Sequence, residues 1–152
     1  MSNDIVVVDT SIAVKWMVQE ADTANALALL AGWVGNGIMR LTPSLLVYET
    51  ANALYQHVRL GEIVLSGVSG AMDDLYVTVL VLDAASDRAL SVRAVEIAHQ
   101  LGLGPAYDTQ FLALAEQQDC EYWTADLRFW TTAQSRFPQV RWLGELRAAG
   151  HP

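Results

Sequence analysis

The sequence is poor in the features that mark secreted, membrane-spanning or zinc-binding proteins. Its single cysteine, Cys120, cannot form an internal disulfide. Acidic residues bound its longest apolar run, LYVTVLVL, so no segment approaches the roughly 20 residues that a transmembrane helix needs. Neither histidines nor cysteines stand at the spacing of a zinc site. The first residues, MSNDIVVVDTS, lack the basic start and cleavage site of a signal peptide, so we expect a cytoplasmic protein without membrane contacts.

Positive charge is also scarce. Lys15 is the single lysine among nine basic residues, which face 17 acidic ones, and the formal net charge is -8. A protein that holds nucleic acid by bulk electrostatics needs many cationic contacts. A phosphate-containing substrate would therefore need local help from a bound metal ion or a few arginines. The acidity suits a basic protein partner equally well.

The chain has the size and the hydrophobic content of one domain. With 152 residues, 53% of them hydrophobic, it can bury roughly 70% of the surface that its unfolded form exposes. It contains no repeat, low-complexity tract or linker. We expect a single domain over residues 1–152, with its core at about 5–143.

Short apolar stretches alternate along the chain with segments of helical periodicity. We expect strands at residues 5–9, 39–42, 77–82, 121–124 and 140–143, the third of them buried and the last at an edge. Helices are expected at residues 11–18, 23–34, 45–60, 63–74, 86–101 (capped by Ser86), 107–118 and 127–133. Because parallel strands need crossover connections and bury both faces, this order predicts an α/β three-layer sandwich with a mainly parallel central sheet flanked by helices.

Four acidic residues stand where such a sheet can bring them to one rim. Asp9 ends the first expected strand, Asp126 follows the fourth, and Asp108 opens a helix. Ligands of parallel α/β sheets collect outside the carboxyl ends of the strands. Glu49 lies inside a helix, on the stripe that Leu45 and its neighbours turn toward the core.

Each aspartate has a simpler explanation, because an aspartate before a helix can cap it for about 1 kcal/mol. Glu49 has no capping role, and no lysine or arginine lies within a helical turn of it. A buried, unpaired carboxylate costs several kcal/mol, so Glu49 should be neutral, paired, metal-bound or at the edge of its stripe. Asn52, Ser11 and Thr124 are placed to orient a carboxylate, although Ser11 also suits a helix start.

Converging carboxylates favour a divalent cation. Two of them about 4 Å apart repel by about 1 kcal/mol in water and about 4 kcal/mol at an effective dielectric of 20. Without a cation some would stay protonated. A ligand set made only of oxygen atoms indicates Mg²⁺ or Mn²⁺.

Four segments in this order, VVVDTSIAVKW, ETANAL, YDTQFLALA and TADLRF, resemble the PIN-domain nucleases, and in particular the VapC-type toxins of bacterial toxin–antitoxin pairs. The likeness spans about residues 5–143. The residues that match the family's acids and their polar companions are Asp9 and Ser11, Glu49 and Asn52, Asp108, and Thr124 with Asp126. Thr109 and Gln110 depart from the small or apolar residues usual after Asp108, and residues 61–74 show no family signature.

The resemblance implies a PIN-like fold and an endoribonuclease in which the four acids hold one or two Mg²⁺ or Mn²⁺ ions. Metal of this kind lowers the pKa of a bound water, and the expected products carry 5′-phosphate and 3′-hydroxyl ends. Lys15 and Arg128 are candidates for phosphate contacts; a solvated helix face and a surface ion pair are the alternatives for them. The implied partners are an RNA substrate, a cognate antitoxin and a second copy of the chain.

Other functions remain open at this point. A non-catalytic PIN-fold protein-binding domain would use the acidic groove for a partner alone, and a housekeeping RNA-processing nuclease would act without an antitoxin. A receiver domain would need a lysine after its last acid, whereas the one lysine is Lys15. A phosphatase of the haloacid type would need an aspartate two residues after Asp9, where Ser11 stands.

Overall fold

A computed structural model describes residue 1 and residues 4–148 of the chain. Within them, five parallel strands form one sheet in the order β3-β2-β1-β4-β5. The strands are β1 (Ile5–Val8), β2 (Met39–Pro43), β3 (Leu80–Leu82), β4 (Glu121–Thr124) and β5 (Val140–Trp142). The predicted α/β architecture with a parallel central sheet is confirmed.

Helices connect successive strands and continue beyond the last one. They are α1 (Thr10–Met17), α2 (Thr23–Gly35), α3 (Leu45–Arg59), α4 (Val68–Thr78), α5 (Arg88–Leu101), α6 (Asp108–Gln117), α7 (Leu127–Ala133) and α8 (Glu145–Ala148). Two single 3₁₀ turns precede α4 and α5, at Leu65–Gly67 and Ala84–Ser86. Over the described residues, no helix combines the length and the apolar character that crossing a bilayer requires.

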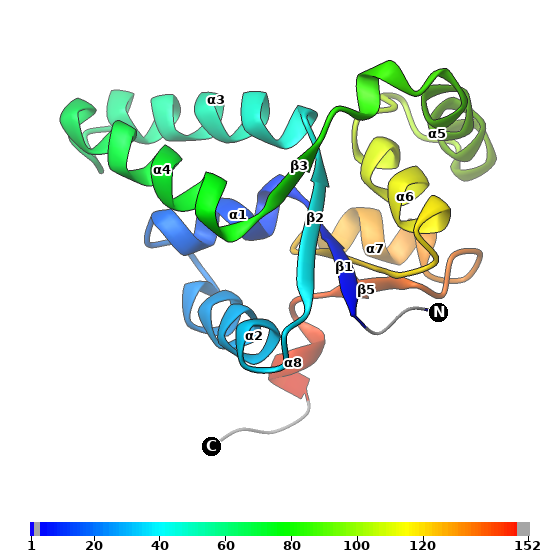
Figure 1. Ribbon diagram of the computed structural model, residues 1–152, viewed down its shortest axis with the longest axis horizontal. Coiled ribbons are helices and arrows are strands. Elements are labelled where there is room, and N and C mark those ends of the chain that lie inside the picture. Colours follow the sequence, from blue (N-terminus) through cyan, green and yellow to red (C-terminus); the bar gives the residue numbers. More distant parts are fainter. Residues whose placement is uncertain (2–3, 149–152) are drawn as a thin grey trace.

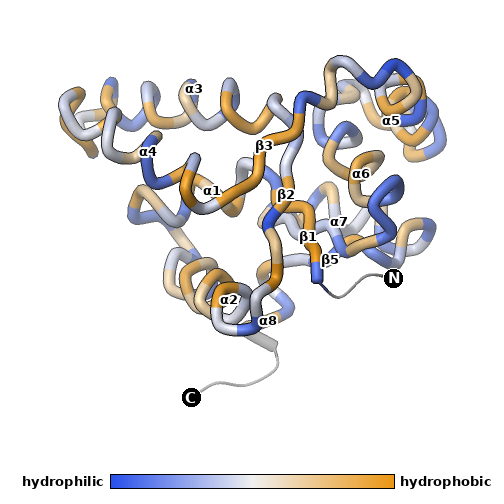
Figure 2. The backbone as a smooth tube through the Cα atoms, in the orientation of Figure 1, coloured by the Kyte–Doolittle hydropathy of each residue, from blue (hydrophilic) through white to orange (hydrophobic). Residues whose placement is uncertain are grey.

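The central strand β1 is apolar on both faces, as a strand between two helical layers must be. Val7 packs into the cluster that contains Phe111 and Leu112 of α6, whereas Val6 and Val8 pack on the opposite side with Trp33 of α2. Alternate side chains of a strand point to opposite faces, which explains this division. In Figure 2 the tube along β1 has the hydrophobic colour.

Three layers result from this packing. In Figure 1 the sheet runs through the centre of the molecule, with α1 and α2 on one side and α5, α6 and α7 on the other, while α3 and α4 project together past the sheet. A third apolar cluster, formed by Val14, Val18 and Leu54, joins α1 to α3.

The third expected strand is partly wrong. Val77 and Thr78 belong to α4, and β3 begins only at Leu80. Leu75 and Val79 explain the difference: both are buried, and their four-residue spacing is that of a helix face, which prevails over the β-branched composition. β3 also lies at the edge of the sheet and is half-exposed, where a buried strand was expected.

Two helix starts also differ from expectation. The fourth helix begins at Val68, later than expected, because residues 65–67 form a 3₁₀ turn. The cap of α5 is Asp87, whose Oδ1 accepts a hydrogen bond from the amide of Leu90 at 3.2 Å, and Ser86 lies in the preceding turn. The expected bounds of β4 and α7 agree with the structure residue for residue.

The packing of α6 can be tested by truncation. Leu112 is 0% exposed within the main apolar cluster, so Leu112→Ala should lower the free energy of unfolding by about 2–5 kcal/mol. Leu27→Ala is the matched control, because Leu27 is 45% exposed on α2 and its truncation should cost well under half as much. Chemical denaturation of both variants measures the difference. Equal losses would mean that α6 does not pack as described.

Candidate active site

Asp9 is the most buried of the four acids, at 4% exposure, and lies between β1 and α1. Its Oδ1 accepts hydrogen bonds from the amide and the hydroxyl of Ser11, at 3.0 and 2.5 Å. Its Oδ2 accepts from the hydroxyls of Tyr122 at 2.8 Å and Thr124 at 2.7 Å. Burial raises the pKa of Asp9, and the bonds from Ser11, Thr124 and Tyr122 oppose that rise.

The loop that follows β4 determines the direction of two of these bonds. The amide of Ala125 donates to the Ser11 hydroxyl oxygen at 2.8 Å, and the amide of Asp126 donates to the Thr124 hydroxyl oxygen at 3.0 Å. Each hydroxyl has one hydrogen to give, and with its oxygen accepting from the loop, that hydrogen points to Asp9. The same contacts therefore orient Asp9 and hold Asp126 close to it in the fold.

Glu49 lies half-buried on α3 and faces α1, so its side chain is at the edge of the expected apolar stripe. Its Oε1 accepts a hydrogen bond from the Thr10 hydroxyl at 2.9 Å. Burial raises the pKa of Glu49, the Thr10 bond lowers it, and repulsion from Asp9 raises it further. The carboxylate of Glu49 is thus near enough to Asp9 for their charges to interact.

The negative charges of all three other acids act on Asp108. Burial raises its pKa to about 6, and repulsion from Asp9, Glu49 and Asp126 adds to the rise. It occupies the first turn of α6, where Tyr107 is the capping residue and makes no side-chain capping bond. Among the described residues, none donates a hydrogen bond to the Asp108 carboxylate or forms an ion pair with it. Asp108 is therefore the least satisfied acid of the site.

Asp126 caps α7 and is exposed. Its Oδ1 accepts from the amides of Arg128 at 2.8 Å and Phe129 at 3.0 Å. The capping explanation thus holds for Asp126 and also for Asp9, whose side chain caps α1, but it fails for Asp108. Capping and a place in the acidic group are compatible, since each carboxylate has two oxygens.

The four acids suit a divalent ion in chemistry and charge. Their donors are all oxygen atoms, and in the described part of the chain none of the four takes part in an ion pair. Their mutual repulsion is the penalty that a doubly charged ion removes. Over the same residues, however, no three acidic, histidine or cysteine side chains gather tightly around one point. The oxygens of Asp9 point to protein donors, and one oxygen of Asp126 points to the amides of α7. The four carboxylates therefore do not all point to one common centre.

The structure brings Ser11 and Thr124 into direct contact with Asp9, whereas Asn52, Lys15 and Arg128 lie apart from it. Asn52 is exposed and accepts from Gln56 at 3.5 Å. The Lys15 ammonium is 3.0 Å from Glu20 Oε2 and largely buried, so a phosphate would have to replace that ion pair. Arg128 is exposed beside Asp126.

Sequence reasoning missed Thr10 and Tyr122, which donate to Glu49 and Asp9. Tyr122 had a recognisable signal: it lies two residues before Thr124 in β4, and side chains two apart on a strand share a face. Both hydroxyls consequently reach the same oxygen of Asp9. Thr10 had no comparable signal, because its contact crosses from α1 to α3.

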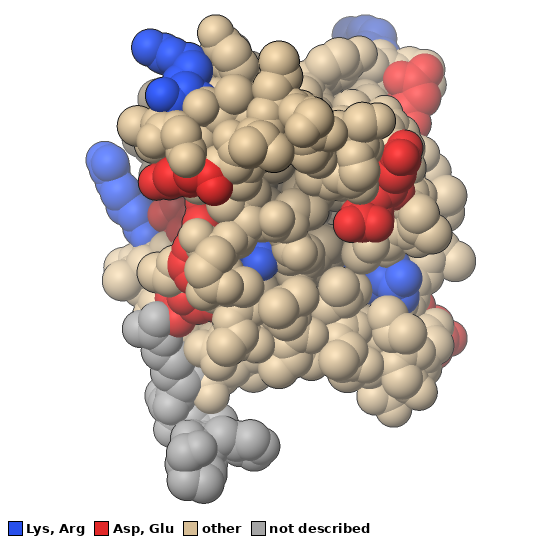
Figure 3. Space-filling view, turned by 90° about the vertical axis from the view of Figure 1, so that its left-hand side faces the viewer, with Lys and Arg blue, Asp and Glu red and all other residues tan. Residues whose placement is uncertain are grey.

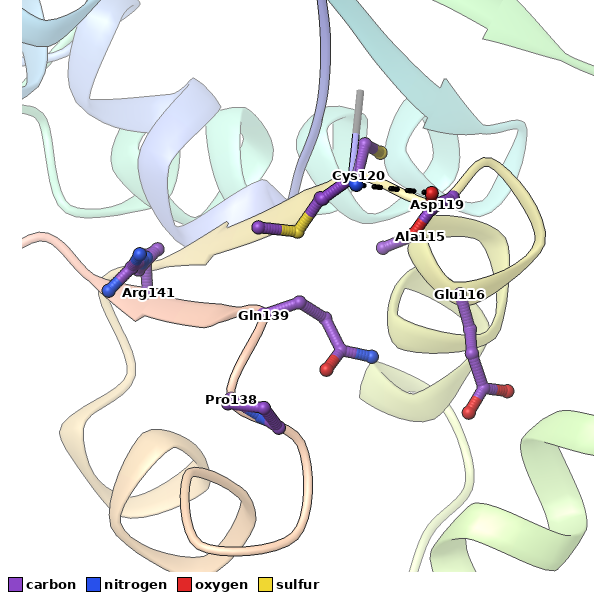
Figure 4. Close-up of a pocket in the computed structure, with 8 residues that line it drawn as sticks. Ala115, Glu116, Asp119, Cys120, Pro138, Gln139 and Arg141 are labelled. Carbon is purple, nitrogen blue, oxygen red and sulfur yellow. Dashed lines mark ion pairs between the residues drawn. The ribbon is translucent and has the colours of Figure 1, made fainter. Parts of the chain in front are cut away.

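A hollow of about 390 Å³ lies at the amino ends of two strands, away from the acids. Cys120 and Gln139, which directly precede β4 and β5, are in its wall (Figure 4). Its charged groups have partners: Asp119 lies 3.3 Å from the N-terminal ammonium, and Arg141 donates to Glu121 at 2.9 Å. Burial raises the pKa of the Cys120 thiol to about 11, which keeps it protonated and a poor nucleophile. The acidic rim remains the candidate site.

The sequence pattern of the PIN domain family matches residues 6–134. That range contains all four acids and every hydrogen bond that they accept. No curated protein sequence matches the chain.

Three solved structures share the fold. PAE2754 from Pyrobaculum aerophilum superposes with a TM-score of 0.66 at 20% identity, covering 95% of this chain and 94% of its own. VapC20 from Mycobacterium tuberculosis, a toxin that cleaves the sarcin-ricin loop, gives 0.63 at 19%, covering 90% and 98%. VapBC2 from Rickettsia felis, solved with a DNA fragment from its promoter, gives 0.61 at 16%, covering 90% and 95%.

The repulsion at Asp108 predicts a pH-dependent stability of the metal-free protein. With a folded-state pKa of about 6 against 3.8 for the free side chain, folded protein keeps a proton that the unfolded chain has lost. Asp108 therefore does not lower the free energy of unfolding below about pH 4, and it lowers that free energy as pH rises through 6. In chelator at pH 8, Asp108→Asn should be more stable by on the order of 1–2 kcal/mol, after allowance for solvent screening.

Thermal unfolding between pH 4.5 and 8 measures this effect. Asp73→Asn on the exposed face of α4 is the control and should leave the pH profile unchanged. A lower stability of Asp108→Asn at pH 8 would contradict the described repulsion.

The bond from Tyr122 to Asp9 gives a second prediction. Tyr122→Phe removes one donor from a fully buried carboxylate without leaving a cavity, so it should lower the free energy of unfolding by about 1–3 kcal/mol. Tyr48→Phe, on a side chain that is 72% exposed, should change it by less than about 0.5 kcal/mol. Urea denaturation of the two variants tests the difference, and a neutral Tyr122→Phe would show that Asp9 does not depend on this hydroxyl.

Proposed function

The chain belongs to the PIN-domain family, and on that premise we propose that it is a metal-dependent endoribonuclease, the toxin of a toxin–antitoxin pair. The observation that carries the proposal is the state of Asp108: three other carboxylates repel it, and no described basic side chain neutralises it. A stable fold gains nothing from such a group. A site that binds Mg²⁺ or Mn²⁺, as one ion or two, requires it.

Asp9, Glu49, Asp108 and Asp126 would hold the ion, which when bound supplies an activated water and screens charge on the phosphate. Its four donors hold the Asp9 carboxylate in one position and oppose the rise in pKa that burial causes, as a rigid ligand requires. Asp108 is free to turn toward the ion because nothing in the described residues restrains its carboxylate. Thr10 orients Glu49 in the same supporting role that Ser11 and Thr124 have for Asp9.

RNA is the substrate that best fits this site. One structural neighbour, VapC20, is a toxin that cleaves the sarcin-ricin loop, which supports RNA for a chain of the same fold. The net charge of -8 requires that phosphate binding be local to the ion and its nearest arginine. An enzyme of this kind acts where RNA is plentiful, so the proposed location is the cytoplasm.

Two protein partners complete the proposal. Figure 3 looks onto the side where α3 and α4 project, and its basic residues are separate and do not form a patch. Leu60, Val64 and Leu65 there are 70–72% exposed, an apolar surface that suits an antitoxin with a basic segment for the acidic rim. Val77 and Leu80, at 81% and 48% exposure beside the outer edge of β3, suit a second copy in a homodimer.

The proposal is tested by substituting the most buried acid. Asp9→Asn keeps the size of the side chain, so the protein should fold and yet lose at least about 100-fold in RNA cleavage in Mg²⁺ or Mn²⁺. Asp73→Asn should cleave normally. Sequencing of RNA ends after brief induction of each form measures activity and target together, with 5′-phosphate and 3′-hydroxyl products expected.

Other outcomes separate the remaining functions. Cleavage that persists in Asp9→Asn or in chelator would reject this site and its metal. Absence of Asp9-dependent cleavage in a folded protein would favour the non-catalytic binding domain. Cleavage without growth arrest, or arrest that no small neighbouring gene product relieves, would favour the housekeeping nuclease.

A further inference from the structure

A hollow of about 420 Å³ adjoins the acidic rim on the side of α7. Asp108 and Asp126 form part of its wall, so it opens directly onto the group of four acids. Its other walls are the connection from α5 to α6 and the face of α7, represented by Leu101, Leu103, Pro105, Arg128, Phe129 and Thr132. The hollow is thus acidic at one end, aliphatic within, and supplied with one cation.

That cation is not engaged elsewhere. Arg128 is exposed, and its guanidinium makes no ion pair or hydrogen bond with any residue that the structure describes. Arg93 and Arg141, by contrast, donate to Glu116 and Glu121 at 2.6 and 2.9 Å. The backbone amide of Arg128 is bonded to Asp126 Oδ1, which fixes the start of its side chain at the edge of the rim.

We propose that this hollow holds one nucleotide of the RNA next to the scissile phosphate, with its phosphate on Arg128 and its base against the aliphatic wall. The assignment rests on the proposed nuclease function. Small-ligand sites have volumes of roughly 300–1,000 Å³, so a hollow of about 420 Å³ has room for one nucleotide. A phosphate is drawn to this hollow because the guanidinium of Arg128, which has no partner among the described residues, offsets the neighbouring acids there.

The aliphatic wall determines the kind of recognition. Leu101, Leu103 and Pro105 offer no side-chain hydrogen-bond donor or acceptor, so they read the shape and size of a base rather than its edge. Phe129 is only 4% exposed and cannot present a stacking face. The amides of Gly102 and Leu103 already donate to α5, which closes that helix. We therefore expect a preference by base size, with little discrimination between bases of one size.

Gly104 allows the hollow to be filled without disturbing the fold. It lines the hollow, and a Cβ placed on it meets no atom within 4 Å. Its backbone does not have the positive φ of Gly102, which is +65°. Gly104→Trp should therefore fold and obstruct the nucleotide. Gly70→Trp on α4, where a Cβ also meets nothing within 4 Å, is its matched control.

The experiment measures binding separately from cleavage. The wild-type full-length protein is titrated in Ca²⁺, which takes oxygen ligands as Mg²⁺ does and should support little cleavage, with a single-stranded RNA oligonucleotide and with versions that each carry one abasic nucleotide, by fluorescence anisotropy. Wild-type cleavage of the same oligonucleotide in Mg²⁺ locates the scissile bond. One abasic position next to that bond should weaken binding about tenfold. In Gly104→Trp the intact RNA should bind about tenfold more weakly, and the abasic position should then change Kd less than twofold.

Arg128 is tested in the same titration. Arg128→Ala should weaken binding about tenfold and reduce the slope of log Kd against log salt by about 0.7, the value for one phosphate contact on a single strand. Arg128→Lys should restore most of both. Arg88→Ala, at the far end of α5, should change neither, since Arg88 is exposed and remote from the hollow.

Two results would overturn the nucleotide site. One is a Kd that no abasic position changes, and the other is a full loss of affinity from the abasic position in Gly104→Trp, in addition to the loss from the substitution itself. The two proposals fail in different ways: cleavage without a one-nucleotide footprint removes only the subsite, and a footprint without cleavage by wild type removes only the nuclease. Absence of RNA binding altogether overturns both.

Discussion

The arrangement of the candidate site depends on one buried carboxylate that the protein holds in place with hydrogen bonds. Asp9 accepts four hydrogen bonds from residues of α1 and β4, and two of these donors are themselves held by amides of the loop that carries Asp126. Burying a charge of this kind is costly unless it is fully bonded. Asp9 consequently links β1, α1 and β4 at the rim where the other acids gather.

The other acids differ from Asp9 in how well they are satisfied. Glu49 has one donor and Asp126 has two, whereas Asp108 has none among the described residues. Burial and three like charges raise the pKa of Asp108 to about 6, so the rim is destabilised near neutral pH in the absence of a cation. Unfavourable groups of this sort persist where function needs them and the surrounding packing over-determines the fold. Leu112 and Phe111, both buried on the same helix, provide that packing.

The sequence predicted those elements whose ends are set by neighbouring residues, such as a capping side chain. β4 and α7 were predicted with the bounds they have, because Asp126 stops a short apolar strand and caps the helix after it. The strand predicted to begin at Val77 was wrong at its start, because its composition favours a strand while Leu75 of α4 and Val79, the residue that ends this helix, are buried at helical spacing. Only the tertiary packing of α4 decides between these two patterns.

The three aspartates were predicted from their positions at strand ends and a helix start, and Glu49 from its place on the apolar stripe of a helix; the structure brings their charges within reach of one another. Their polar support was predicted in part. Ser11 and Thr124 are close in sequence to the acids that they orient, and Tyr122 follows the same strand period, although it was missed. Thr10 reaches Glu49 across 39 positions of sequence, from another helix. Spacing along one chain does not report such a contact, because it depends on how α1 packs against α3.

The charge of the whole molecule and the charge of the rim have different consequences for a phosphate substrate. At physiological salt the screening length is about 8 Å, so acids on distant faces contribute little at the rim, whatever the net charge of -8. The four carboxylates within the rim are not screened from one another in this way, and without a cation they repel a phosphate. On the proposed function this fixes an order of binding: the divalent ion must neutralise Asp108 and its neighbours before RNA can approach. Arg128 then makes one side of the ion more favourable than the other, which gives the RNA strand a direction across the site.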